Sequence, residues 1–152
     1  MMAGQRKTLR LQGYDYSEPG GYFITIAVQG HAYRFGEVKD GEMALSAAGK
    51  IVERAWQDLP NHYPNVVLDD YAVMPDHFHG ILILTDVSGD GLTETIRAFK
   101  SFSARRINLM DGTTGKPVWQ RSYFDRILRG ERELDAARQY IRANPLRWKA
   151  DP

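Results

Sequence analysis

The sequence predicts an α+β fold: a ferredoxin- or RRM-like antiparallel sheet with helices on one face, followed by a C-terminal helix. Three observations indicate this class. Runs rich in β-branched and aromatic residues alternate with segments of helical periodicity. Short turns join neighbouring runs, as in antiparallel sheets. The chain of 152 residues is 43% hydrophobic and 26% charged, which is typical of one globular domain.

The first part of the chain supplies most of the expected strands. In order, these span residues 22–28, 33–38, 43–45, 66–73 and 78–84. An Asp-Gly pair, Asp40 and Gly41, predicts a hairpin turn between the second and third strands. A short turn at Pro75 and Asp76 joins the last two strands.

Three helices and one further strand complete the expected order. The helices are expected over residues 47–59, 92–109 and 131–143, and the strand over residues 118–120. Ser46 suits the N-cap of the first helix, which should end before Pro60. Pro145 should end the last helix near Asn144, because the residue before a proline is driven out of helical geometry. The inward stripe of the second helix consists of Leu92, Ile96, Phe99, Ser103, Ile107 and Met110.

Several classes of protein are excluded by what the sequence lacks. No cysteine is present, which excludes disulfide frameworks, thiolate zinc sites and cysteine nucleophiles. No apolar run approaches the roughly 20 residues that a membrane helix needs. Residues 1–13 are polar and lack the apolar core of a secretion signal. We therefore expect a cytoplasmic protein with no membrane partner, made of a flexible segment at 1–13 and a single domain over residues 14–152.

Charge is divided unevenly along the chain. Residues 1–91 carry 7 Lys and Arg against 12 Asp and Glu, whereas residues 92–152 carry 13 against 7. A net charge of +6 in the second part suggests a polyanionic partner, although basic residues also decorate solvated helix faces. No nucleotide cofactor is expected, because the glycine-containing stretch at residues 112–116 lacks the spacing of a Walker motif.

Two of the four histidines form a pair. His77 and His79 are two residues apart at the start of an expected strand, so both side chains point to one face while Phe78 points to the other. Two imidazoles on one face can bind a single metal ion. A purely structural role, with one histidine at the strand end and the other packed under a helix, is the alternative.

Tyr140 and Asn144 form a second constellation. Residues four apart share a face of a helix, so the phenol and the amide should lie side by side. The apolar stripe of this helix is Leu134, Ala137 and Ile141, which places Tyr140 on its flank. Taken alone, this pattern fits a half-buried tyrosine with a polar residue at the helix end.

With both constellations present, the chain resembles the HUH single-tyrosine transposases, the IS200-like family. His77-Phe78-His79 resembles their His-hydrophobic-His motif. Residues 140–145, Tyr-Ile-Arg-Ala-Asn-Pro, resemble the Tyr-x-x-x-Asn-Pro helix of the REP-associated tyrosine transposase branch. The resemblance extends over residues 14–148, including residues 21–25, 73–75, 119–120 and 124–126. Asp76 is a departure, since relatives often carry Asn there.

The resemblance implies metal-dependent cleavage and rejoining of single-stranded DNA beside hairpins. Tyr140 would be the nucleophile and would form a 5′-phosphotyrosine intermediate. His77, His79 and Asn144 would bind a divalent metal, Mg²⁺ or Mn²⁺. The partner would be single-stranded DNA with hairpins, and both a monomer and a homodimer fit the sequence.

Basic and aromatic residues of the second part would contact this DNA. The candidates are Arg97, Lys100, Arg105, Arg106, Arg121, Arg126, Arg129 and Arg147 for phosphates, and Trp119 and Trp148 for unpaired bases. Two other interpretations stay open. A non-catalytic single-stranded nucleic-acid-binding protein on an RRM-like fold would share the basic face, but it would not need a histidine pair aligned with a tyrosine helix. A small metallohydrolase could use His-x-His, but barrel enzymes with that motif have far longer chains.

Overall fold

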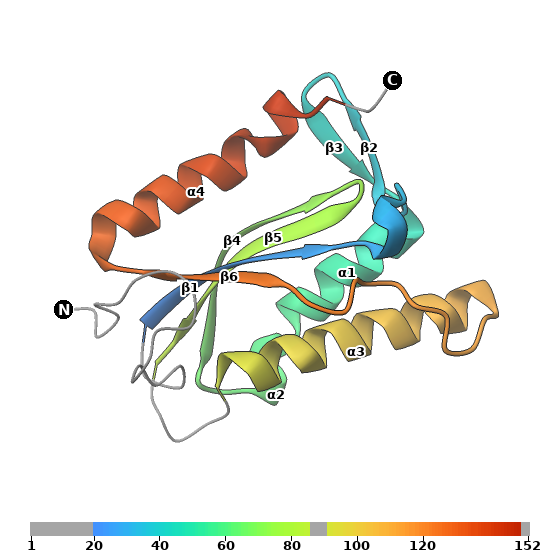
Figure 1. Ribbon diagram of the computed structural model, residues 1–152, viewed down its shortest axis with the longest axis horizontal. Coiled ribbons are helices and arrows are strands. Elements are labelled where there is room, and N and C mark those ends of the chain that lie inside the picture. The colour runs from blue at the N-terminus through green and yellow to red at the C-terminus, as the bar shows by residue number, and fades with distance from the viewer. Residues whose placement is uncertain (1–19, 86–90, 150–152) are drawn as a thin grey trace.

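A computed structural model describes residues 20–85 and 91–149 of the chain. The N-terminal segment over residues 1–13, expected to be flexible, lies outside the described residues. In chain order the elements are β1 (Gly20–Ala27), η1 (Gln29–His31), β2 (Gly36–Lys39), β3 (Glu42–Leu45), α1 (Ala47–Gln57), α2 (Leu59–His62), β4 (Val66–Met74), β5 (His77–Leu84), α3 (Leu92–Asp111), β6 (Phe124–Leu128) and α4 (Gly130–Arg147) (Figure 1). The α+β class is therefore confirmed.

The main sheet has four strands in the order β4-β5-β1-β6, and every neighbouring pair is antiparallel. Strands β2 and β3 form a separate hairpin. The register between β1 and β5 sets Thr25 opposite His79 and Ala27 opposite His77. The histidine pair thus lies at the start of the central strand β5, beside the end of β1.

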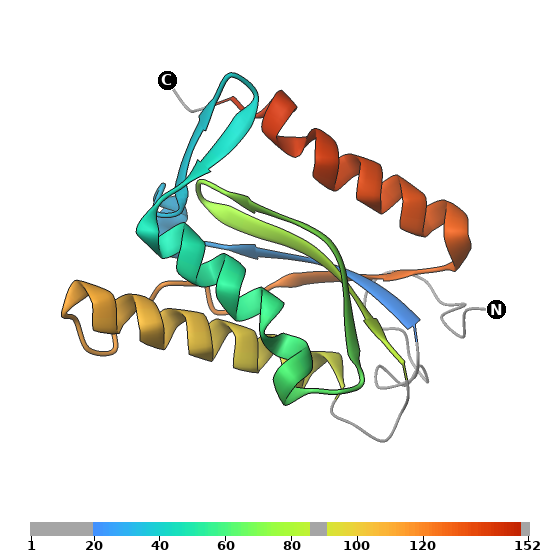
Figure 2. The same cartoon turned by 180° about the vertical axis from the view of Figure 1, so that it is seen from behind.

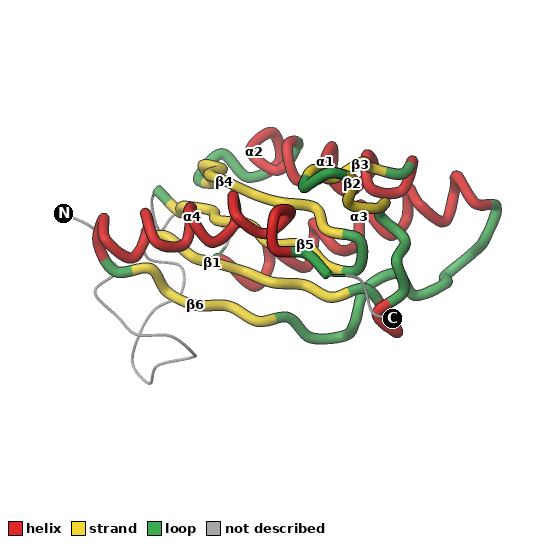
Figure 3. The backbone as a smooth tube through the Cα atoms, turned by 90° about the horizontal axis from the view of Figure 1, so that it is seen from above, coloured by secondary structure: helices red, strands yellow, loops and turns green. Residues whose placement is uncertain are grey.

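Alternating residues of β1 supply the two faces of the sheet with different cores. Tyr22, Ile24 and Ile26 belong to a large buried cluster that includes residues of α1 and α3. Phe23 belongs to a small cluster with Ala137 and Ile141 of α4. Helices α1 and α3 therefore cover one face and α4 covers the other, an arrangement visible from behind and from above (Figures 2 and 3). The sequence predicts helices on one face plus a C-terminal helix, and the structure adds that this last helix lies on the opposite face.

Two local signals in the sequence are confirmed by the backbone. Asp40 and Gly41 have φ values of 54° and 77°, the left-handed conformation that a two-residue hairpin turn requires. Ser46 is the N-cap of α1, and its Oγ accepts a hydrogen bond from the Gly49 amide at 3.0 Å.

The strand expected at residues 118–120 is wrong. Val28 and Trp119 make an isolated bridge there, and the fourth strand of the sheet is β6. Residues 124–128, Phe-Asp-Arg-Ile-Leu, place charges in the middle of the strand, which hides its apolar alternation. Asp125 nevertheless is buried, because it points to the face covered by α3.

Two expected helix ends also differ from the structure. The helix expected over residues 47–59 is divided into α1 and α2, and Pro60 lies in the first turn of α2. A proline at that position loses no helical hydrogen bond. Pro145 lies inside α4, which continues to Arg147. The last turn of α4 meets the β2–β3 hairpin, where a Cβ added at Gly41 would lie 2.8 Å from Leu146 Cδ2. The proline removes one helical hydrogen bond, and the helix ends two residues after it.

The stripe predicted for the second helix is confirmed except at its end. Leu92, Ile96, Phe99, Ser103 and Ile107 are buried in α3, whereas Met110 is 46% exposed. No helix within residues 20–85 and 91–149 is long and apolar enough to cross a membrane.

Candidate active site

The histidine pair faces α4 from the start of β5. His77 Nε2 and His79 Nε2 lie 3.0 Å apart, and their ring centroids are 4.5 Å apart. Phe78 points the other way and is fully buried in the large core. The prediction that the two histidines share a face is confirmed.

The remaining ring nitrogens of both histidines have partners. His77 Nδ1 lies 2.7 Å from Asp76 Oδ1, and His79 Nδ1 lies 2.8 Å from Thr25 Oγ1. When the proton of each ring is on Nδ1 and is donated to these oxygens, both Nε2 atoms present lone pairs. The two partners thus turn the same nitrogen of each ring toward the shared space.

The pair has the spacing that one divalent cation requires. Two neighbouring ligands of an octahedral ion, with bonds of about 2.1 Å, lie about 3.0 Å apart. Burial, followed by the charge of His77, lowers the pKa of His79 to about 3, and a hydrogen bond from the ring to the Asn144 side chain, which favours the protonated form, opposes this in part. His79 is therefore neutral near pH 7, as a metal ligand must be. In the part of the chain that the structure describes, no three His, Cys, Asp or Glu side chains are arranged to hold one metal ion, so a third protein ligand has to be of another type.

Helix α4 brings Tyr140 and Asn144 to this pair within one chain. The Tyr140 ring contacts the His79 ring edge-on, with ring centroids 5.4 Å apart. Tyr140 is 45% exposed. Asn144 Nδ2 donates to the Tyr140 carbonyl oxygen at 2.8 Å, and the Asn144 side chain also hydrogen-bonds to His79. The amide thus joins the tyrosine helix to the histidine strand, and the phenol is accessible to a large substrate.

Arg147 and Trp148, which follow Asn144 in the chain, complete the rim of the site. The Arg147 guanidinium lies 5.0 Å from the centre of the Tyr140 ring, and the Trp148 ring lies 6.2 Å from that of His77. Together with Lys149 they line a depression of about 250 Å³ beside Tyr140 and Asn144. A cation and a partly buried indole next to the phenol suit a phosphate and an unpaired base.

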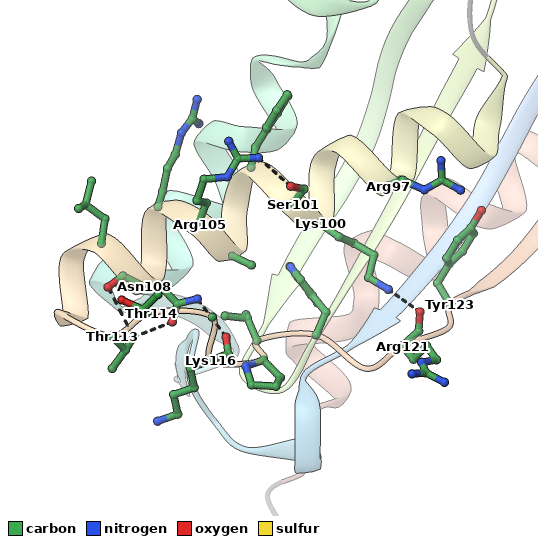
Figure 4. A pocket seen from close by; sticks show the side chains of 18 of the residues that line it. Arg97, Lys100, Ser101, Arg105, Asn108, Thr113, Thr114, Lys116, Arg121 and Tyr123 are labelled. Carbon is green, nitrogen blue, oxygen red and sulfur yellow. Dashed lines mark hydrogen bonds between the residues drawn. The ribbon is translucent and has the colours of Figure 1, made fainter.

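Five of the predicted phosphate contacts gather elsewhere. Arg97, Lys100, Arg105, Arg106 and Arg121 line a groove of about 1130 Å³ between α3 and the segment at residues 113–123 (Figure 4). Because α3 covers the other face of the sheet, this basic groove and Tyr140 lie on opposite sides. Lys100 Nζ donates to the carbonyl oxygens of Gln120 and Arg121, both at 2.8 Å, which fixes one wall of the groove.

Arg126, Arg129, Arg147 and Trp148 lie outside this groove, whereas Trp119 lines it as a largely buried side chain. Arg126 is opposite Phe23 in the register of β6 and β1, and its guanidinium lies 5.6 Å from the Phe23 ring, on the face of the tyrosine. Arg129 precedes α4, and its amide donates to Glu133 Oε1 at 2.8 Å. Trp119 requires a correction, because it is only 7% exposed and its indole N–H donates to Ser103 Oγ at 2.9 Å. It is a core residue, with too little free surface to stack on a base.

Sequence reasoning missed the residues that support the site from other elements. Thr25 belongs to the stretch 21–25 that shares the family resemblance, but it lies on a different strand from the histidines, and no spacing in the sequence connects it to them. Asp69 and Asp70 of β4, and Arg138 and Arg142 of α4, form ion pairs between strand and helix. The sequence shows acidic residues in the strand and basic residues in the helix. Only the packing of α4 on β4 shows which of them form ion pairs.

Comparison with known proteins gives consistent matches. The family model described as "Transposase IS200 like" matches residues 50–144. A Haemophilus influenzae protein of undescribed role is 31% identical, with 96% of this chain and 91% of that protein covered. Among solved structures, a REP-associated tyrosine transposase bound to a REP hairpin has a TM-score of 0.67 at 19% identity, covering 91% of this chain and 73% of its own. A predicted transposase from Deinococcus radiodurans has a TM-score of 0.51 at 22% identity, covering 88% and 95%.

The two structural matches support the fold. The family model spans most of the residues that build the site. It includes the histidine pair, Tyr140 and Asn144. The chain therefore belongs to the IS200-like transposase family.

Proposed function

We propose that this transposase cleaves and rejoins single-stranded DNA at hairpin-forming repeat sequences through a 5′-phosphotyrosine intermediate, with Mg²⁺ or Mn²⁺ as the metal. One observation carries the proposal. Two imidazole nitrogens 3.0 Å apart face the helix whose Tyr140 ring contacts His79 in the same chain. A nucleic-acid-binding protein without catalysis would have no need for this alignment.

His77, His79 and Asn144 would hold the metal. Two imidazole nitrogens and one amide oxygen leave positions for phosphate oxygens and water, which suits Mg²⁺ or Mn²⁺. When bound, the cation polarises the scissile phosphate and stabilises the charge that develops on it. Asp76 and Thr25 support this role by orienting the two rings.

Tyr140 would be the nucleophile. Its hydroxyl oxygen attacks the scissile phosphorus, the phenol loses its proton, and a bond forms between Tyr140 and the 5′ phosphate. The bond from phosphorus to the 3′ oxygen breaks, and that oxygen leaves as a protonated 3′ hydroxyl. Attack by a 3′ hydroxyl on the phosphotyrosine reverses the step and restores Tyr140, so rejoining consumes no nucleotide cofactor.

Cations on both faces support a DNA substrate. Arg147 and Arg126 lie on the face of the tyrosine, where they can contact the backbone near the cleavage position. The basic groove on the opposite face is lined by six Lys and Arg side chains, which suit a second part of the same DNA. A related structure of this fold is bound to a REP hairpin, which supports a hairpin as that second part.

The proposal is tested with labelled oligonucleotides. A hairpin-bearing single strand and a duplex of the same sequence are incubated with the protein and Mn²⁺, and cleavage products are separated on a denaturing gel. We expect cleavage of the single strand alone, and its loss in the His77→Ala/His79→Ala variant with DNA affinity largely kept, because phosphate contacts supply most of the binding.

Undiminished cleavage by that variant would contradict the metal assignment. Equal cleavage of duplex and single strand would indicate an ordinary endonuclease. Tight binding without cleavage by the native protein would favour the non-catalytic nucleic-acid-binding alternative.

A further inference from the structure

A cluster of charged residues lies on the flank of α4 that faces away from the histidines. Arg138 donates through Nε to Asp69 Oδ1 at 2.8 Å and through Nη2 to Asp69 Oδ2 at 2.7 Å. Arg142 Nε donates to Asp70 Oδ2. We call Asp69, Asp70, Arg138 and Arg142 the helix clamp, and none of the four lies in the proposed metal site or the basic groove.

An irregularity of β4 explains why two consecutive carboxylates bond to the same helix. Neighbouring residues of a regular strand point to opposite faces of the sheet. The pairing of β4 with β5 shifts register between Leu68 and Tyr71, which is the mark of a β-bulge. Asp69 and Asp70 lie within this bulge, and the Asp70 amide donates to Asp69 Oδ1 at 2.7 Å. The bulge therefore directs both carboxylates to α4.

The helical period sets the clamp and the tyrosine on opposite flanks of α4. At about 100° per residue, Arg138 and Arg142 share one flank because they are four residues apart. Ala137 and Ile141 are buried against the sheet, and Tyr140 lies on the flank beyond them, next to His79. Rotation of α4 about its own axis thus moves Tyr140 relative to His79, and the clamp opposes that rotation from the far flank.

The apolar contacts under α4 are few, so the ion pairs contribute to fixing the rotation of the helix. The buried cluster there consists of Phe23, Ile81, Leu128, Ala137 and Ile141. Helix α4 supplies the last two, a small side chain and one isoleucine, and its partly buried Leu134 packs against them. The Asp69 side chain is 13% exposed, and the hydrogen bond from Arg138 lowers the pKa of this carboxyl, so the bidentate pair stays charged at neutral pH.

We propose that the helix clamp is a positioning device for Tyr140, which fixes the rotation of α4 so that the phenol meets the histidine pair. The inference rests on the proposed function, because it takes Tyr140 as the nucleophile. A side chain extends about 6 Å from the axis of its helix, so a rotation of about 10° displaces its tip by about 1 Å. A displacement of this size can lower a rate by about 100-fold.

The test compares Asp69→Asn/Asp70→Asn with a matched control, Glu37→Gln/Glu42→Gln. Both variants remove two negative charges, but the control residues are exposed on the β2–β3 hairpin. Three quantities are measured for each: the single-turnover rate of covalent product formation at saturating hairpin oligonucleotide and Mn²⁺, the Kd for the same oligonucleotide, and Tm. Hydrogen exchange of the α4 amides is measured without DNA.

We expect the Asp69→Asn/Asp70→Asn variant to lose about 10- to 100-fold in rate, with Kd and Tm close to those of the control and faster exchange in α4. An Asp69→Glu/Asp70→Asn variant keeps the charge at position 69. Its rate should be higher than that of Asp69→Asn/Asp70→Asn. An unchanged rate would overturn the proposal, and so would a loss of rate that follows a matching fall in Tm, since that would be a structural effect. If the native protein forms no covalent product, the proposed function fails. In that case hydrogen exchange alone tests the helix clamp, and unchanged exchange of the α4 amides in Asp69→Asn/Asp70→Asn would overturn the clamp proposal.

Discussion

Replacing Thr25 by Val tests whether the hydroxyl of β1 fixes the metal-facing nitrogen of His79. Thr25 Oγ1 lies 2.8 Å from His79 Nδ1, and His79 is 5% exposed. Valine has nearly the shape of threonine but cannot accept a hydrogen bond. The substitution therefore leaves a buried ring N–H without its partner and releases the ring orientation that presents Nε2 to the cation.

The size of the effect follows from that buried N–H. Leaving such a group unpaired costs about 1–3 kcal/mol. Without metal, the released ring can change its tautomer or orientation and avoid this cost, whereas metal binding imposes it. Because every 1.4 kcal/mol corresponds to about a tenfold change in an equilibrium constant, the loss in metal affinity is about 5- to 150-fold. This agrees with the usual effect of removing a partner of a ligating histidine.

The assay is a calorimetric Mn²⁺ titration of the native protein, Thr25→Val, Thr25→Ser and Thr85→Val. Thr25→Ser keeps the hydroxyl and should keep the affinity. Thr85 is exposed just after the other end of β5, with Oγ1 donating to the Asn65 carbonyl at 3.2 Å, so its change to Val should leave Mn²⁺ binding as it is. Native affinity in a folded Thr25→Val protein would refute the reasoning.

Three further predictions concern the supporting residues. Asp76→Ala should weaken Mn²⁺ binding by about tenfold in the same titration, whereas Asp76→Asn should keep most of it, because Asn still offers an oxygen to His77 Nδ1. Trp119→Phe should lower the free energy of unfolding by about 1–2 kcal/mol through loss of the bond to Ser103, seen in chemical denaturation, and leave DNA affinity unchanged in a gel-shift assay. Arg105→Ala should weaken binding of all sequences alike and reduce the slope of log K against log salt by about one in a salt titration.

The sequence was sufficient for the parts of the fold that depend on local patterns. The histidine pair shares a face because a strand alternates, and the Asp40-Gly41 turn and the Ser46 cap follow from conformational preferences of single residues. Tyr140 and Asn144 lie side by side because they are one helical turn apart. All of these need only the geometry of one element.

The errors arose where tertiary packing decides. β6 carries charges in its middle and is a strand because β1 offers it a partner. Pro145 lies within the last turn of α4, although the residue before a proline locally disfavours helical geometry. Trp119 lies in the basic, aromatic part of the sequence but is held in the core by α3. The clamp depends on a bulge and on two elements far apart in the chain, so no local pattern reports it.

A covalent link between Tyr140 and DNA tests the central claim most directly. Native protein, Tyr140→Phe and Tyr123→Phe are each incubated with Mn²⁺ and a hairpin oligonucleotide labelled at its 3′ end, and the mixtures are run on a denaturing gel. Tyr123 is the matched control, because it lines the basic groove on the opposite face of the sheet.

The account predicts that the label migrates with the native and Tyr123→Phe proteins and not with Tyr140→Phe, which keeps the ring and loses only the nucleophilic oxygen. Tyr140→Phe should bind DNA as the native protein does. A label that migrates with Tyr140→Phe, or a native reaction that yields only free DNA ends, would contradict it.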